Sequence, residues 1–216
     1  MPALISWWTQ DVAALAPGAD PGQVAEAGAD LLARWTEPHR RYHGARHLVE
    51  MFWALKDLTD AGELTAEDAA LARVAAWLHD AVYDPMTTPG ANEAASALLG
   101  HDLLTRLVLD PAKVQTVVDL IRMTADHVAA GRTALERAFH DVDLWILAAD
   151  GERFDDYCAQ VREEYASVPD AVFRPARSAI LQSLVGADGF YLTAHGCRHW
   201  EGPARDNLAR ELARLS

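Results

Sequence analysis

The dipeptide His79-Asp80 closes an apolar run that starts at Ala72, and it is the first point in the sequence that indicates chemistry. A carboxylate at the end of an apolar helix face needs a partner, because burying it alone costs several kcal/mol. A bound cation would be such a partner. His-Asp also occurs by chance in many proteins, so the pair gains weight only if other segments can complete a metal site.

Two segments could complete it: Tyr42–His47, which reads Tyr-His-Gly-Ala-Arg-His, and Asp141–Leu144, which reads Asp-Val-Asp-Leu. His43 and His47 are four residues apart, a spacing that places both side chains on one face of a helix. Taken alone, such a pair is more often two half-buried or surface histidines. Imidazoles combined with carboxylates suit several metals, including zinc, manganese, iron and nickel.

A site made of His47, His79, Asp80 and Asp143 would offer two nitrogen and two carboxylate ligands. Open positions on the cation would let it bind and activate water. Asp143 belongs to a segment that we expect to begin an apolar helix. The alternative is that an acid caps this helix, and Asp141 could be that cap while Asp143 points inward.

The elements that must position these residues are predicted to be almost entirely helical. Clear strand alternation is absent, and apolar residues from Val114 to Ile121 follow helical spacing. Asp20-Pro21, Asp110-Pro111 and Thr65–Asp68 are typical of helix starts. The patterns predict helices over residues 3–16, 21–36, 44–61, 66–81, 91–106, 111–126, 132–149, 151–167, 170–186 and 203–215.

Two long irregular stretches are predicted, at residues 81–90 and 186–202. The first follows His79-Asp80 directly and contains Pro85 and Pro89, so it cannot continue the helix. Loops beside a rigid site often form its rim. We therefore expect this stretch to determine substrate specificity.

The composition predicts one compact domain over residues 1–216, since the chain is 50% hydrophobic and long enough to bury a core. No apolar stretch approaches the roughly 20 residues of a membrane span. The N-terminus lacks the basic flank and long apolar core of a signal peptide. We expect a cytoplasmic protein with no membrane partner, in which Cys158 and Cys197 are free thiols.

The formal net charge of −13 disfavours binding to duplex nucleic acid, whose phosphates such a chain repels. A small phosphorylated substrate is still compatible with this charge, because a metal ion and nearby arginines can reverse the field inside one pocket. The sequence also allows a homodimer.

The order of these residues resembles that of the HD-domain metal-dependent phosphohydrolases: a His, then His-Asp, then a distant Asp. Tyr42–His47 is also similar to the Tyr-His-Asn-x-x-His stretch of cyclic-nucleotide phosphodiesterases, which belong to the same superfamily. Most closely, the chain resembles a bacterial group of HD phosphohydrolases of about this length. The matching segments are Tyr42–His47, His79–Tyr83, Asn92–Ala97, Asp141–Leu144, Arg162–Tyr165 and Ala204–Leu208.

The resemblance implies an all-α fold, an HD-domain-like helical bundle with extra N- and C-terminal helices. It also implies a divalent metal ion, with manganese, nickel, cobalt, zinc, iron and magnesium as candidates. The implied ligands are His47, His79, Asp80 and Asp143. His43 matches the phosphodiesterase histidine thought to protonate the leaving group, although Gly44 stands where that pattern has Asn. Asp80 could both bind the metal and orient water.

Four further residues are candidates for the same site. Glu93 could orient the attacking water or hold a ligand in place, or it could simply be an acid in the first turn of its helix. Arg46, like Arg122, could bind phosphate, although most arginines are solvated surface groups. His127 could bind a second metal or phosphate, or it could lie at the negative end of a helix dipole. The other histidines are expected to be structural or on the surface: His39, His101, His140, His195 and His199.

The sequence therefore favours a metal-dependent phosphohydrolase that cleaves a phosphate ester, for which a nucleotide is one candidate, through a metal-activated water. Two alternatives stay open. An HD-type di-iron oxygenase would hold two irons and consume oxygen. A non-catalytic sensor of a metal or nucleotide would bind its ligand tightly without turnover.

Overall fold

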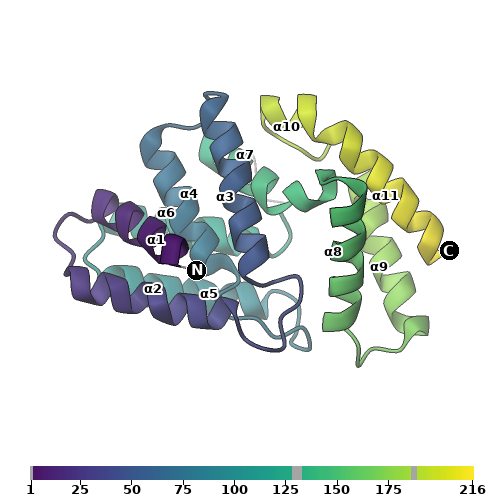
Figure 1. The fold of residues 1–216 in the computed structure, drawn as a ribbon, viewed down its shortest axis with the longest axis horizontal. Helices are drawn as coiled ribbons and strands as arrows, with labels where there is room; N and C mark the ends of the chain where they lie inside the picture. The colour runs from purple at the N-terminus through teal and green to yellow at the C-terminus, as the bar shows by residue number, and fades with distance from the viewer. Residues whose placement is uncertain (1, 128–132, 186–188) are drawn as a thin grey trace.

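The computed structural model describes residues 2–127, 133–185 and 189–216, and over these residues the predicted all-α class is confirmed. The helices are joined by turns and short loops, and the described residues contain no strand (Figure 1). The elements are α1 (Pro2–Leu15), α2 (Pro21–Trp35), α3 (Ala45–Asp60), α4 (Ala66–His79), α5 (Ala91–Arg106), α6 (Pro111–Met123), α7 (Ala134–Asp143), the 3-10 helix η1 (Trp145–Ala148), α8 (Gly151–Glu164), α9 (Asp170–Val185), α10 (Ala194–His199) and α11 (Glu201–Leu215).

Helix α4 lies at the centre of the first part of the fold and packs against α1, α3, α5, α6 and α7. All its residues from Ala69 to His79 are buried except Arg73, so it is apolar on nearly every side. Trp77 packs edge-on against Trp8 of α1, and its carbonyl accepts a 2.8 Å hydrogen bond from the Trp35 indole. Because α4 is fixed on all sides, its last residue, His79, has a fixed position in the interior.

The predicted helix caps are present. The side chains of Asp20, Thr65 and Asp110 each accept a hydrogen bond from a backbone N–H in the first turn of the helix they precede. These bonds satisfy donors that have no partner inside the helix. The start of each of these three helices could therefore be read from the local sequence.

The predicted helix over 132–149 is wrong in its middle, and residue 132 lies outside the described residues. The segment divides into α7 and η1, so Asp141 and Asp143 lie at the end of a helix and do not begin one. Asp141 is therefore not the cap of an apolar helix. Its buried carboxylate instead accepts hydrogen bonds from the backbone of Leu192 and from the backbone and hydroxyl of Thr193.

The stretch predicted to be irregular over 186–202 contains the short helix α10, and residues 186–188 lie outside the described residues. Thr193 caps this helix by accepting a hydrogen bond from Gly196 N–H. A Cβ at Gly196 would lie 2.6 Å from Asp141 Oδ2, so this close approach of α10 to α7 requires glycine.

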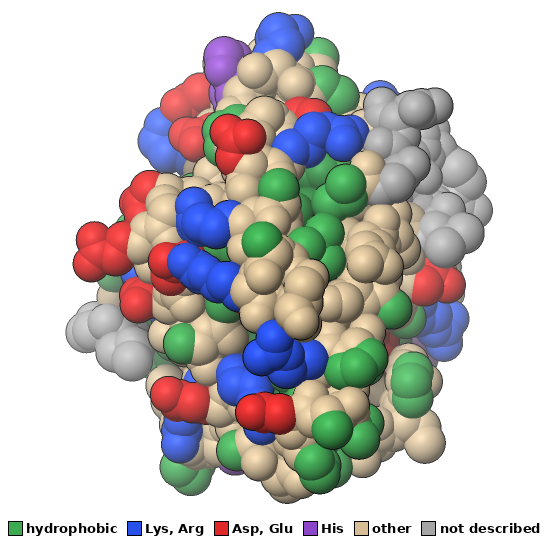
Figure 2. All heavy atoms as spheres, turned by 90° about the vertical axis from the view of Figure 1, so that its right-hand side faces the viewer, with side chains coloured by type: hydrophobic (Ala, Val, Ile, Leu, Met, Phe, Trp, Pro, Cys, Tyr) green, Lys and Arg blue, Asp and Glu red, His purple; other side chains and the backbone are tan. Residues whose placement is uncertain are grey.

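The C-terminal helices α8, α9, α10 and α11 lie to the right of α3 and α7 in Figure 1. Figure 2 shows this side of the molecule, where basic and acidic side chains are interspersed. Part of this pattern is an ion-pair group in which Asp155 of α8 accepts from Arg210 and Arg214 of α11. Within the described residues, no helix is both long enough and apolar enough to cross a membrane.

Candidate metal centre

Three helix ends bring the four predicted ligands together. His47 lies in the first turn of α3, His79 is the last residue of α4 with Asp80 directly after it, and Asp143 is the last residue of α7. His47 and His79 are 3% and 1% exposed, and Asp80 is 8% exposed. The Asp143 side chain is 13% exposed. Residues that are up to 96 positions apart in the chain thus lie together in one site that is almost completely buried.

The donor atoms of these residues face one another. The two Nε2 atoms of His47 and His79 are 3.3 Å apart, and Asp143 Oδ1 lies 3.3 Å from the first and 3.4 Å from the second. Asp80 Oδ2 lies 3.0 Å from His79 Nε2 and 4.0 Å from His47 Nε2. Ligands bound at about 2.0–2.2 Å to one cation lie roughly 3–3.5 Å from each other, close to these separations. The buried His47–His79–Asp80 group could therefore bind a metal ion.

Hydrogen bonds on the far side of each ring orient the two imidazoles. His79 Nδ1 donates to the Ala76 carbonyl at 2.9 Å, so in the neutral ring Nε2 carries the lone pair that points into the group. His47 Nδ1 contacts the Tyr42 hydroxyl at 3.1 Å. Histidines that bind metals are commonly fixed in this way through their other nitrogen.

The carboxylates and imidazoles of this group stabilise each other's charged forms. Burial would raise the pKa of Asp80 and of Asp143, but His79 and the other nearby histidines together outweigh it and hold both values well below their usual range. Burial would also lower the pKa of His79, yet Asp80 and Asp143 raise it well above its ordinary value. The site thus favours positive charge between its carboxylates, and a metal ion would compete with protons for the imidazole nitrogens.

A hydrogen-bonded pair, His43 and Glu164, lies beside this group. His43 Nδ1 donates to Glu164 Oε2 at 2.7 Å, and the Tyr83 hydroxyl donates to the same oxygen at 2.8 Å. Glu164 Oε1 accepts from the backbone N–H groups of Arg41, Tyr42 and His43 at 2.7–3.0 Å. Because its Nδ1 is taken, His43 has Nε2 as the nitrogen left for other chemistry.

This network shifts the pKa of both members of the pair. Burial opposes ionisation of Glu164, but the hydrogen bond from His43 and the surrounding donors lower its pKa to about 2. Burial likewise opposes protonation of His43, but the bond to Glu164 and the negative charges of Glu164, Asp80 and Asp143 together overcome it and raise the pKa of His43. Glu164 is therefore an anion at neutral pH, and it favours the protonated form of His43.

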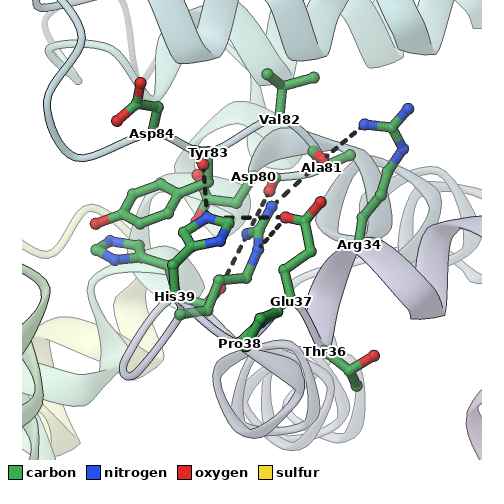
Figure 3. Close-up of polar contacts among 12 residues, drawn as sticks. Arg34, Thr36, Glu37, Pro38, His39, Asp80, Ala81, Val82, Tyr83 and Asp84 are labelled. Atoms are coloured by element: carbon green, nitrogen blue, oxygen red, sulfur yellow. Dashed lines mark hydrogen bonds and ion pairs between the residues drawn. The ribbon is translucent and has the colours of Figure 1, made fainter.

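Arg40 fixes the backbone on both sides of the site. Its Nη1 donates to the carbonyl of His43 at 2.9 Å and to that of Asp80 at 2.8 Å, and its side chain is 1% exposed. Around it, Glu37 pairs with its Nε, and His39 contacts the Tyr83 carbonyl at 2.9 Å (Figure 3). Arg40 was not predicted from the sequence, because the two carbonyls that it joins are distant in the chain and belong to no motif.

A cavity of about 420 Å³ opens onto the group. Its lining includes the four predicted ligands together with His43, Glu93, His127 and Arg177. Glu93 lies in the first turn of α5, and its Oε2 is buried with no hydrogen-bond partner among the described residues. An oxygen in that state can accept a hydrogen bond from water in the cavity.

His127 lies in this cavity but not at the end of a helix as predicted, because α6 stops at Met123 and His127 adopts a left-handed backbone with φ of 58°. Its Nε2 lies 3.5 Å from Asp143 Oδ2. Its Nδ1 contacts Nδ1 of His140, whose Nε2 donates to the Phe190 carbonyl at 2.7 Å. With His140 Nδ1 thus an acceptor, His127 Nδ1 is the donor, and its neutral ring presents a bare Nε2 to Asp143.

The structure does not bring Arg46 to this cavity. Its guanidinium is about half exposed, at 55%, and pairs with Glu50 at 3.1 Å and Asp156 at 3.3 Å. Arg122 is exposed on α6 and is also absent from the lining. The arginine that does line the cavity is Arg177 of α9, which no sequence signal indicated.

Taken together, the site combines a ligand set for a cation, an imidazole held by a buried carboxylate, a buried acceptor and one guanidinium. Such a set can hold a metal ion, bind an anion beside it, and donate or accept a proton at His43 Nε2. Comparison of the chain with protein-family models, with curated proteins and with solved structures found no match.

Proposed function

We propose that this chain is an HD-type phosphohydrolase that binds a divalent cation through His47, His79, Asp80 and Asp143 and cleaves a phosphate ester. The observation that carries the proposal is the position of His43. A proton donor held by Glu164 lines the same cavity as the four ligands. In metal-dependent hydrolysis of a phosphate ester, a cation stabilises the phosphoryl group and an acid protonates the leaving oxygen.

The residues present fit a metal ion. The two imidazoles offer nitrogen lone pairs and the two carboxylates bring negative charge, a mixed set that suits manganese, nickel, cobalt, zinc or iron, with magnesium as a further candidate. A cation bound there would polarise a phosphoryl oxygen and lower the pKa of a bound water towards about 7. Glu93, with its unpartnered buried oxygen, is assigned the role of orienting water.

His43 is assigned the role of general acid. Glu164 holds its ring through Nδ1, and the ring stacks on Tyr83 with the two centroids 4.3 Å apart. The proton therefore resides on Nε2, the nitrogen that is free to donate to a departing oxygen. The raised pKa of His43 favours the form that carries this proton.

The direct test is the metal content of the native protein, followed by a screen of phosphomonoesters and phosphodiesters with manganese, nickel, cobalt, magnesium and zinc. His79→Ala and Asp80→Ala are each expected to abolish metal binding and metal-supported turnover. The chain offers a matched control in His101-Asp102, a His-Asp pair that lies on the surface with a 3.1 Å contact between its side chains. His101→Ala should leave both properties unchanged, and full activity in His79→Ala would refute the proposal.

One observation favours a second candidate, a two-metal enzyme of the oxygenase type. His127 presents Nε2 next to Asp143, so a second ion could be held on the outer side of that carboxylate. Two irons per chain with oxygen consumption would support this candidate. Tight nucleotide binding without turnover in any metal would instead indicate a sensor.

A further inference from the structure

A second cavity, of about 400 Å³, adjoins the cavity that opens onto the four predicted ligands. It is lined mainly by α8 and α9, and the two cavities share the side chains Tyr42, His43, Tyr157, Arg177 and Ile180. A ligand that filled both would therefore pass His43 at the boundary. Cavities of this size are large enough to enclose a small organic molecule.

The second cavity is apolar and offers few hydrogen bonds. Most of its wall consists of aliphatic and aromatic side chains: Val161, Val168, Val172, Phe173, Ala176 and Ile180. The hydroxyls of Tyr42 and Tyr157 are already bonded, to His47 and to Arg177 respectively. A sugar that lay against this wall would find few protein partners for its hydroxyls, whereas an apolar group would gain from leaving water.

Arg177 stands between the two cavities, and Glu211 attracts its guanidinium without forming an ion pair with it. Its Nη2 bonds the neutral Tyr157 hydroxyl at 2.5 Å, and its guanidinium lies 5.1 Å from the centroid of the Tyr157 ring. Among the described residues, no carboxylate forms an ion pair with it. A guanidinium in this state matches the oxygens of a phosphoryl group.

The positions of the predicted ligands, His43 and the second cavity define how a bound phosphate ester would be oriented. If its phosphoryl group lies by the metal ligands and Arg177, its bridging oxygen falls at the boundary, where His43 stands. The esterified group then lies in the second cavity. We infer that this cavity is a leaving-group pocket and that the substrate is a phosphate monoester of an apolar, ring-containing alcohol or phenol. This inference rests on the proposed function and narrows it, because the ribose of a nucleotide would be a poor occupant.

The test uses the full chain loaded with the metal that supports turnover. Phenyl phosphate and 2-naphthyl phosphate have leaving groups of similar acidity, so a leaving-group pocket changes KM more than kcat. The second ring buries additional apolar surface, and we expect a KM about tenfold lower for the naphthyl ester. Equal KM values for the two esters, or a lower KM for glucose 6-phosphate, would overturn the inference.

Ala176→Trp fills the pocket from an exposed position on α9, where the larger side chain does not enter the core. We expect it to remove the preference, raising KM about tenfold for the naphthyl ester and less than about twofold for the phenyl ester. Ala209→Trp is the matched control, since Ala209 is exposed on α11 and lines neither cavity. Equal effects of Ala176→Trp on both esters would contradict a pocket for the leaving group.

A binding measurement separates this inference from the proposed function. Phenylphosphonate and 2-naphthylphosphonate resist hydrolysis, and calorimetry gives their affinities whether or not any ester is turned over. A tighter binding of the naphthyl compound that disappears in Ala176→Trp supports the pocket even if turnover is absent, an outcome that would refute only the phosphohydrolase. Turnover without any preference in KM or affinity would refute only the pocket.

Discussion

His43 and Glu164 are 121 residues apart in the chain, and their side chains meet at 2.7 Å, Nδ1 to Oε2. Glu164 is the last residue of α8, and its carboxylate also accepts three backbone N–H groups in the turn before α3. Glu164 therefore stabilises this turn and orients the His43 imidazole. Through these bonds it also connects α8 to the segment that precedes the predicted ligand His47. Loss of this acid should affect stability and chemistry at once.

Glu164→Gln is expected to lower the free energy of unfolding most at neutral pH. The pKa of Glu164 is lowered from 4.5 to about 2, so the stability it contributes is present above pH 4.5 and is lost as the pH falls towards 2. The difference from the native protein should be about 3 kcal/mol at pH 7 and should shrink below pH 4.5. Urea unfolding of both proteins across this pH range measures it.

The neighbouring Glu163→Gln is the control for that experiment. Glu163 is 63% exposed and pairs with Arg41 at 3.2 Å, a surface pair worth less than about 1 kcal/mol. A gap for Glu164→Gln that stays constant from pH 7 to pH 3 would show that the ionised carboxylate is not the source of the stability.

His43→Gln should lower kcat by about 10²–10⁴, the usual contribution of a general acid, while metal content stays that of the native protein. The reason is that His43 belongs to the cavity but not to the group of donor atoms around His47, His79 and Asp80. Metal analysis and steady-state kinetics on the same preparation separate the two effects. Loss of metal together with activity would instead make His43 a ligand or a structural residue.

Removing the metal should lower the melting temperature. A cation that binds only the folded chain adds about 2.7 kcal/mol when present at 100 times its Kd. Thermal unfolding with and without a chelator should show this shift in the native protein and in His101→Ala, but not in His79→Ala. A shift of equal size in His79→Ala would place the bound metal elsewhere.

Arg177→Met should raise KM for every phosphomonoester by about 10–100-fold, because the loss of a charge-assisted bond to phosphate is worth about 1.5–3 kcal/mol. Its effect should be the same for phenyl and naphthyl esters, since the guanidinium binds the group they share. Arg174, an exposed arginine one turn earlier on α9, bonds carbonyls at the C-terminus and is the control. An equal rise in KM for Arg174→Met would indicate that KM depends on the net charge of α9 and not on a contact between Arg177 and the phosphoryl group.

Gly196→Ala should destabilise the fold by about 1–3 kcal/mol, because the added Cβ meets side-chain oxygens that hydrogen bonds hold in place. It would lie 2.6 Å from Asp141 Oδ2 and 2.9 Å from Thr193 Oγ1. Gly202→Ala is the contrast: its Cβ meets nothing within 4 Å, and alanine in a helix should leave stability unchanged or raise it by up to about 1 kcal/mol. Urea unfolding of the two variants tests the ranking.

Local signals were enough to predict most of the helices, and three of the predicted ligands lie in the group that could bind a metal ion. The caps at Asp20, Thr65 and Asp110 depend on residues within one turn, so the sequence contains all of each interaction. The break between α7 and η1 was not predictable in this way. It accompanies the contacts of Asp141 with residues 192 and 193, which only the folded chain brings near.

The dipeptide His-Asp also shows that local sequence does not reveal tertiary contacts. It occurs three times in the chain, and its surroundings alone distinguish the copies. His79-Asp80 ends a helix that is buried on nearly every side, His101-Asp102 lies on the surface, and His140-Asp141 bonds the segment from Phe190 to Thr193. Arg177 lines both cavities although no local sequence motif marks it, because its position depends on how α9 lies against α8.

The guanidinium of Arg40 has a mechanical consequence. A single planar, rigid group bonds the carbonyl of the proposed acid, His43, and the carbonyl of the proposed ligand, Asp80. The spacing between these two segments is thereby fixed before any ligand binds. Lysine, a flexible point charge, could not act as such a spacer.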